Sequence, residues 1–346
     1  MTIYPTQSHE KDAKNMTTQA KPQQSQFMRQ FREILSPMVA LILIYAAIWV
    51  LAPTFRSTAA FANIFENASI LFIMCTGMTI ALIGGCLDLS VGSIYALVSV
   101  VVGQLLTFYH VPVALAILAG LLAGVLCGVI NGLIVTGTGI PTLIATLGTQ
   151  LAFRGVANMI GAASNMSHFP ASFDILGSGT WGPVINCIIA FAVIWFILNR
   201  TKLGFQSYAV GGNPEVARLS GIPVKKNMIL YYCLSGLMAG LAGIVYTARV
   251  DMAQVNRGNG MELWAIAGVV VGGTSMMGGS GSVVKTIIGV MIITILQTGM
   301  IHLHVPSFWQ QVATGALIIV AVWLDFVQRR ARERVRRAAT AEEKAT

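Results

Sequence analysis

The sequence is poor in charged side chains, and this sets the class of protein. Only 10% of its 346 residues are charged, 55% are hydrophobic, and the mean hydropathy is +0.73. Soluble domains carry about 25% charged residues, and a soluble chain of this length needs more polar surface than these residues provide. We therefore expect an all-α polytopic membrane protein.

Metal-binding and catalytic patterns are scarce as well. The five cysteines lie in or beside apolar runs, and none forms a CxxC or Cys/His spacing typical of a metal site. Gly279–Thr286 resembles a phosphate-binding loop, but Val284 stands where the second glycine must be, and no HExxH or GxSxG pattern occurs. We therefore expect no metal site, no cofactor, no catalysis and no ATPase activity in this chain.

Positive charge is unevenly distributed along the chain. Of the 22 Lys and Arg residues, 17 lie in the first 35 residues, in segment 199–227 or after Asp325. Basic residues gather on the cytoplasmic side of membrane proteins, so this pattern predicts three cytosolic segments rather than nucleic-acid binding. We expect a disordered cytosolic tail over residues 1–36, a transmembrane domain over 37–327 that includes the cytosolic loop 199–227, and a basic cytosolic tail over 328–346.

Ten apolar runs approach the length of about 20 residues that a membrane-crossing helix needs. They cover residues 37–53, 68–86, 91–108, 112–135, 140–160, 184–199, 228–249, 263–277, 283–301 and 312–327. Six runs precede segment 199–227 and four follow it, as parity requires if this segment and both termini are cytosolic. Spans five apart then run in opposite directions, which allows an inverted repeat.

Small residues line or interrupt these runs. Their three- and four-residue spacing in 120–133 and 235–244 predicts close helix packing in lipid. Two glycine-rich stretches, Gly84–Ser93 and Gly272–Ser282, break the apolar pattern. Irregular backbone at membrane depth is tolerated only inside the protein or along a cavity, so we expect broken helices beside a pathway.

A few polar side chains in the runs are candidates for lining a solute pathway. Asp88, next to Ser90, stands in a nearly uncharged stretch, and it would cap the following helix, line the pathway, or do both. Gln150, Arg154 and Asn158 recur at four-residue spacing, which predicts a polar stripe on one helix face. Alternatively, Arg154 extends to the outer interface as an ordinary membrane-edge arginine.

The outer loop 249–262 carries alternating charges, namely Arg249, Asp251, Arg257 and Glu262. This pattern predicts either a solvated loop or a docking surface for an external protein, and Glu262 is a further pathway candidate. The remaining polar groups in the spans are mostly Thr, Ser, Asn and Gln, which suit a neutral polar solute better than an ion.

Segment 199–227 has the pattern of a short surface helix preceded by a tight turn at two glycines. Asn213 is a good N-cap, Pro214 suits the first helical position, and Glu215 in the first turn favours the helix dipole. Three-residue spacing predicts one apolar face made of Val216, Leu219 and Ile222. Such an amphipathic helix either closes the loop or offers a contact surface to a soluble partner.

Four ordered motifs resemble those of bacterial sugar ABC importer permeases, the ribose permease family. GMTIALIGGCLDLSVGSIYAL (77–97) resembles that family's G-M-T and G-G-I-D-L-S-V-G-S signature, and LGFQSYAVGGNPEVARLSGIPV (203–224) resembles its cytosolic loop. Segments 235–250 and 262–290 match two further segments of that family, so that the resemblance extends over residues 38–327. Cys86, Trp264 and the triplet Gly279–Gly281 depart from the family pattern, and the change at Trp264 would affect the choice of substrate.

The resemblance implies a permease of about ten helices in the bacterial inner membrane, assembled as a pair. Two ATP-binding subunits, which would carry out the ATP hydrolysis, would dock on loop 199–227. A periplasmic or lipid-anchored sugar-binding protein would dock outside. The loop residues that this resemblance assigns to ATPase coupling are Gly211, Gly212, Asn213, Pro214, Glu215 and Arg218. ATP binding and hydrolysis would switch the pathway between two states, and the sugar could be a pentose, a hexose or a related polyol. The alternative is a secondary sugar transporter in which Asp88 carries a coupling proton; an integral membrane enzyme would need a catalytic constellation that the sequence lacks.

Overall fold

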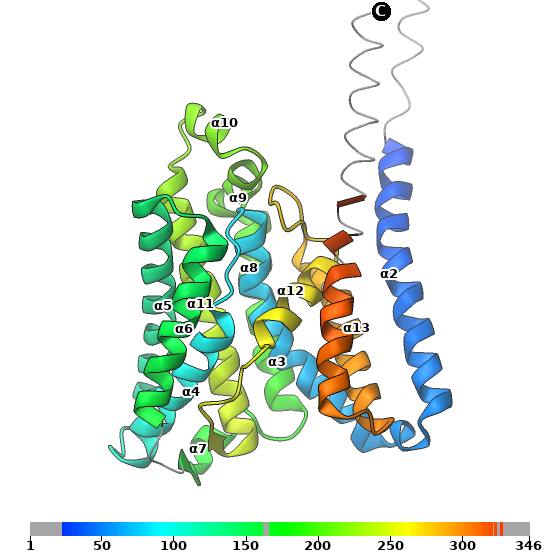
Figure 1. Ribbon diagram of the computed structural model, residues 1–346, viewed down its shortest axis with the longest axis vertical. Coiled ribbons are helices and arrows are strands. Elements are labelled where there is room, and N and C mark those ends of the chain that lie inside the picture. The colour runs from blue at the N-terminus through cyan, green and yellow to red at the C-terminus, as the bar shows by residue number, and fades with distance from the viewer. Residues whose placement is uncertain (1–22, 162–165, 321, 324–325, 328–346) are drawn as a thin grey trace, which may run out of the picture.

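The computed structural model describes residues 23–161, 166–320, 322–323 and 326–327, most of which lie in helices that run side by side (Figure 1). The helices are α2 (Gln23–Leu51), α3 (Thr58–Ile83), α4 (Val91–Thr107), α5 (Val113–Thr138), α6 (Thr142–Gly161), α7 (Ala171–Asp174), α8 (Trp181–Arg200), α9 (Lys202–Gly212), α10 (Pro214–Leu219), α11 (Val224–Val250), α12 (Met261–Val271) and α13 (Val283–His302). A further apolar helix covers Ser307–Val320. The 3-10 helix η1 (Pro53–Arg56) and two short antiparallel strands, β1 (Met166–Ser167) and β2 (Met252–Ala253), complete the elements.

Five of the described helices are long and apolar enough to cross a membrane, namely α3, α5, α8, α11 and α13. Four shorter apolar helices, Pro37–Leu51 within α2, α4, α12 and Ser307–Val320, add to these. α6 has 20 residues but is less apolar. Counting it with the five long and four shorter apolar helices, the described residues hold ten candidate membrane helices. The expected all-α polytopic fold with about ten spans is therefore confirmed.

Helices α3 and α11 form the centre of the bundle. α3 is buried from Ala68 to its end and contacts α8, α11, α12 and α13, while α11 packs against α3, α4 and α5. The contact between α5 and α11 depends on glycine, because a Cβ on Gly236 would lie 2.2 Å from the Gly124 carbonyl oxygen. This confirms the close packing predicted for segments 120–133 and 235–244.

The two ends of the bundle differ (Figure 1). At one end α9 and α10 project beyond the long helices, and at the other end α7 lies below them; we call these the α10 end and the α7 end. Glu66, near the start of α3, pairs with Arg249 at the end of α11, whereas Ile83, the last residue of α3, lies against α9. α3 therefore runs from the α7 end to the α10 end.

Helices α3 and α12 end in the same way. Each is followed by two glycines, the second of which is left-handed, with φ of 75° at Gly85 and 88° at Gly273. In both, the next amide donates to a carbonyl five residues earlier, at 2.8 Å after α3 and 3.1 Å after α12. This helix terminus favours glycine at the left-handed position. The loops 84–90 and 272–282 confirm the predicted breaks, although α12 ends at Val271 rather than near residue 277.

The predicted disordered tail over residues 1–36 is wrong in its second part. α2 begins at Gln23, so residues 23–36 are helical. These residues include Gln, Arg, Glu and Leu, which are good helix formers, so the helix continues beyond its apolar part. Residues 1–22 and the basic tail 328–346 lie outside the described residues.

Candidate functional site

At the α10 end, α9 touches both of the loops that follow α3 and α12. A Cβ on Gly85, in the loop after α3, would lie 3.6 Å from the Gly211 Cα of α9. The Tyr208 hydroxyl of α9 donates to the Gly281 carbonyl, in the loop after α12, at 3.2 Å. The two loops are also joined, because the Gly279 amide donates to the Ile83 carbonyl at 2.8 Å. Burial raises the pKa of Tyr208, which keeps this hydroxyl protonated as a donor. A displacement of α9 would therefore act on both loops.

Four glycines, Gly85, Gly211, Gly278 and Gly279, meet at this contact, which we call the glycine junction. A Cβ on Gly278 would lie 2.9 Å from the Gly211 Cα and 3.0 Å from the Gly85 Cα. The tight turn predicted at Gly211 and Gly212 is wrong, because both residues belong to α9. Gly211 instead allows a close approach: a Cβ there would lie 1.8 Å from the Ile83 carbonyl oxygen.

The predicted surface helix is present as α10, with its predicted N-cap. The Asn213 Oδ1 accepts from the amides of Glu215 and Val216 at 3.0 and 3.1 Å, and Pro214 is the first helical residue. Glu215 and Arg218 form an exposed ion pair at 2.5 Å. The N-cap and first-turn assignments of the sequence analysis are therefore confirmed.

The apolar surface of the α9–α10 hairpin differs from the predicted face. Val216 and Leu219 expose 56% and 78% of their surface, and Phe205 of α9 exposes 76%. Ile222 lies beyond the end of α10 and is half-buried. The helix stops at Leu219 because Gly221, at φ 81°, turns the chain, so the three-residue spacing does not continue to Ile222.

Asp88 is the centre of a fully buried polar network in loop 84–90. Its Oδ1 accepts from the Ser90 amide at 3.0 Å and the Ser90 hydroxyl at 2.6 Å, and its Oδ2 accepts from the Ser235 hydroxyl at 2.7 Å. Asn131 of α5 donates to the Ser90 Oγ at 2.7 Å. Ser90 is the N-cap of α4, so Asp88 binds the capping residue instead of the first helical amides. The network joins the loop to α5 and α11.

The predicted stripe on α6 divides into two parts. Gln150 donates to the Glu262 Oε1 at 2.7 Å, and Arg154 donates to the carbonyls of Val255, Arg257 and Gly92 at 2.7 to 3.1 Å. Asn158 is exposed instead, because eight residues at 3.6 per turn leave it rotated by about 80° from Gln150. Arg154 thus binds the loop before α12 instead of reaching an interface.

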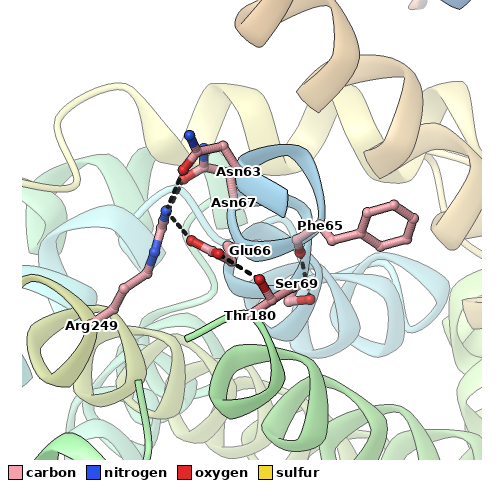
Figure 2. Close-up of polar contacts among 7 residues, drawn as sticks. All are labelled: Asn63, Phe65, Glu66, Asn67, Ser69, Thr180 and Arg249. Atoms are coloured by element: carbon pink, nitrogen blue, oxygen red, sulfur yellow. Dashed lines mark hydrogen bonds and ion pairs between the residues drawn. The ribbon is translucent and has the colours of Figure 1, made fainter. Parts of the chain in front are cut away.

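Figure 2 shows how charges at the α7 end join α11 to α3. Arg249 pairs with Glu66 at 2.5 Å and donates to the side chains of Asn67 at 2.8 Å and Asn63 at 3.1 Å. The Thr180 hydroxyl, just before α8, donates to Glu66 at 2.8 Å. These contacts fix the first turns of α3 against the ends of two other helices.

The other charges of loop 249–262 are also engaged within the chain. Asp251 accepts from the amides of His168 and Phe169 at 3.2 and 2.8 Å. The Arg257 guanidinium lies over the ring of Tyr246, 4.7 Å from its centroid. The loop is nevertheless partly solvated, as one of the two expectations had it, because Asn256, Arg257 and Asn259 are exposed. Its charges also hold it on the bundle.

A polar cavity of about 260 Å³ lies beside this cluster, at the α7 end. Its polar and aromatic lining comprises Asn67, Tyr95, Tyr246, Asn256, Arg257, Asn259, Trp264 and Gln297. Of these, the sequence had singled out only Arg257 and Trp264. The others come from α3, α4, α11, α13 and the loop before α12, and they share no local motif by which the sequence could have revealed them.

These features define a multi-pass membrane protein with a projecting helical hairpin at one end and a polar cavity near the other. Residues 60–322 match the family described as the permease component of branched-chain amino acid transport systems. The chain is 39% identical over 297 residues to the ribose import permease protein RbsC of Bacillus subtilis, which covers 84% of this chain and 92% of that protein.

Two further relatives come from Escherichia coli K12. RbsC, also named a ribose import permease protein, is 36% identical over 90% of this chain and 99% of its own length. AlsC, named a D-allose transport system permease protein, is 38% identical over 82% of this chain and 89% of its own length. No solved structure matches the chain. The chain belongs to this family of transport-system permeases.

Proposed function

We propose that this chain is the membrane-spanning subunit of an ATP-driven importer that carries a monosaccharide, a pentose or a hexose, across the bacterial inner membrane. The names of the relatives support the substrate class, since two are ribose import permeases and one belongs to a D-allose transport system. ATP hydrolysis would take place on a separate cytosolic subunit.

The observation that carries the ATP-driven part of the proposal is the α9–α10 hairpin. It combines exposed apolar side chains, Phe205, Val216 and Leu219, with the exposed Glu215–Arg218 pair in one hairpin. Large exposed apolar groups rimmed by charge are typical of protein interaction sites. We propose that the ATP-binding subunit docks here, in contact with the predicted residues from Gly211 to Glu215 and Arg218.

The glycine junction gives this docking site a physical connection to the interior. α9 contacts the loop after α3, which carries Asp88, and the loop after α12. A ligand or partner can shift a two-state element only through contacts that differ between the states. We propose that the ATPase moves α9, and that the two loops change the pathway in response.

The remaining parts of the assembly follow from orientation. We propose that the α10 end and both termini are cytosolic, because segment 199–227 and the terminal segments hold most of the basic residues. The α7 end then faces outward, where a periplasmic or lipid-anchored sugar-binding protein would dock. A second permease copy would complete the transporter, with lipid around its apolar surfaces.

A proton-coupled transporter is the alternative, because Asp88 is a buried carboxyl group. In this chain, however, the carboxylate is held by Ser90 and Ser235 donors and is fully buried, which suits a structural anchor. Sugar uptake by cells that express the transporter separates the two. We expect uptake to persist with an uncoupler and to stop when ATP is depleted; the opposite result would favour proton coupling.

The docking proposal is tested by exchanging the two charges, Glu215→Arg with Arg218→Glu. Both side chains are about two-thirds exposed, and exposed pairs contribute only about 0–1 kcal/mol, so the permease should fold and reach the membrane in wild-type amounts. We expect loss of copurification with the ATPase and of sugar-dependent ATP hydrolysis. Wild-type ATPase binding and uptake in this variant would refute docking at the hairpin.

A further inference from the structure

We propose that the cavity at the α7 end is a binding site for a single neutral monosaccharide ring. The sugar would occupy this site after it leaves the external binding protein and before it enters the rest of the pathway. This inference rests on the proposed function. The cavity volume of about 260 Å³ lies just below the roughly 300–1,000 Å³ of pockets for drug-sized ligands. A ligand the size of one sugar ring therefore fits, and a larger oligosaccharide does not.

The lining has the chemistry that a sugar needs. Asn256, Asn259 and Gln297 line it, and each amide both donates and accepts hydrogen bonds, as sugar hydroxyls also do. Trp264 and Tyr246 line it as well, and their apolar ring faces suit the C–H face of a sugar ring. Small-molecule sites commonly combine such aromatic surface with a few placed polar groups.

Two polar groups at the cavity are poised for a ligand. Tyr95 lines the cavity and is fully buried, and its hydroxyl has no hydrogen-bond partner among the described residues. Buried tyrosine hydroxyls usually find a partner, and we infer that a shift of the Tyr95 side chain toward the cavity lets its hydroxyl bond a sugar hydroxyl. The Asn67 oxygen accepts from Arg249 at 2.8 Å, so the Asn67 amide nitrogen is oriented for a further bond.

The charge of the lining distinguishes a sugar from a branched-chain amino acid. Among the described residues that line the cavity, Arg257 is charged and none is Asp or Glu, so the carboxylate of an amino acid would find a partner and its ammonium group would not. An amino acid would bring an ammonium group into the cavity without an acidic partner, and a buried charge without a partner is costly. A neutral polyhydroxyl compound avoids this cost.

The test is a titration of the full-length permease in lipid nanodiscs, followed by tryptophan fluorescence. The probes are D-ribose, D-allose and D-galactose, with L-leucine as the amino-acid control. We expect a saturable change with at least one sugar and none with L-leucine. Trp264→Phe should remove most of the change, because Trp264 is the tryptophan at the cavity.

Two variants keep the reporter and remove ligand contacts. Gln297→Leu and Asn256→Leu should each weaken the apparent affinity for the sugar about tenfold, the effect of losing one hydrogen bond. The matched control is Asn199→Leu, since Asn199 is exposed at the end of α8, at the α10 end. Its affinity should equal that of the wild type.

Three results would overturn the proposal: no saturable change in the wild type, equal changes in the cavity variants and the control, or saturation by L-leucine in place of the sugars. ATP-dependent sugar uptake by the assembled wild-type transporter is measured in parallel. Uptake without binding at the cavity would remove this inference and leave the proposed function intact. Absence of uptake would count against the proposed function itself.

Discussion

Gly211→Ala tests whether α9 needs its close approach to α3 and to loop 272–282. The added Cβ would lie 1.8 Å from the Ile83 carbonyl oxygen and 2.5 Å from the Gly279 amide nitrogen. Favourable contacts between heavy atoms lie at about 3.5–4.0 Å. Both neighbours are backbone atoms, so no side-chain rotation relieves the clash, and α9 must move away from α3.

Three contributions to the free energy of unfolding set the size of the effect, of which two are losses and one is a gain. Overpacking costs about 1–3 kcal/mol, and the hydrogen bond between Gly279 and Ile83, at 2.8 Å, contributes about 0.5–1.5 kcal/mol. Alanine is the better helix former by up to about 1 kcal/mol, which offsets part of the loss. We expect Gly211→Ala to lower the free energy of unfolding by about 1–3 kcal/mol.

The neighbouring glycine provides the control. Gly212 belongs to the same helix, and an added Cβ there meets nothing within 4 Å. Thermal unfolding in detergent should show a lower midpoint for Gly211→Ala and a midpoint near the wild type for Gly212→Ala. In the assembled transporter, Gly211→Ala should also hydrolyse ATP with less sugar uptake per ATP. If the two variants behave alike in both assays, the glycine junction does not transmit motion.

Two further predictions concern the interior and the orientation. Asp88→Asn can still accept from Ser90 through its one amide oxygen and can donate from its amide nitrogen to the Ser235 hydroxyl, so it should remain folded and active. Asp88→Leu leaves these buried groups unpaired and should cost roughly 3 kcal/mol or more. Uptake and thermal unfolding measure both effects, and a stable but inactive Asp88→Asn would favour proton coupling. In a cysteine-free background, Gly212→Cys should react with an impermeant thiol reagent only in inverted vesicles and Ile175→Cys only in right-side-out vesicles; the reverse pattern would contradict the orientation.

The fold could be predicted wherever its signal was local. Apolar runs gave most helices to within a few residues, and the Asn-Pro pair gave the start of α10. The beginning of α3 was missed by ten residues, because the helix begins at Thr58 and the apolar run near residue 68. Its first turns hold Asn63, Glu66 and Asn67, which read as a polar loop until Arg249 is known to bind them.

The site was less accessible to sequence reasoning for the same physical reason. Gly211 and Gly212 look alike in sequence, and only the backbone of α3 distinguishes a glycine required for contact from one in open space. The stripe on α6 failed at Asn158 because residues eight apart on an α-helix are rotated by about 80° and do not share one face. The cavity depends on residues from six separate segments, so its existence follows from tertiary packing alone.

The likeness between α3 and α12 explains how one hairpin could act on a distant cavity. Asn67 of α3 and Trp264 of α12 line the cavity, and both helices end at loops that meet Gly211. At 1.5 Å per residue, Asn67 lies about 24 Å along the helix from Ile83, and a buried helix transmits displacement over such a length because the packed interior resists compression.

Coupling between two sites is reciprocal. A sugar that fixes the spacing of α3 and α12 would therefore favour one position of α9, and ATPase binding to α9 would favour one shape of the cavity. Since both helices run toward the glycine junction, their likeness is distinct from the inverted repeat, which stays a prediction.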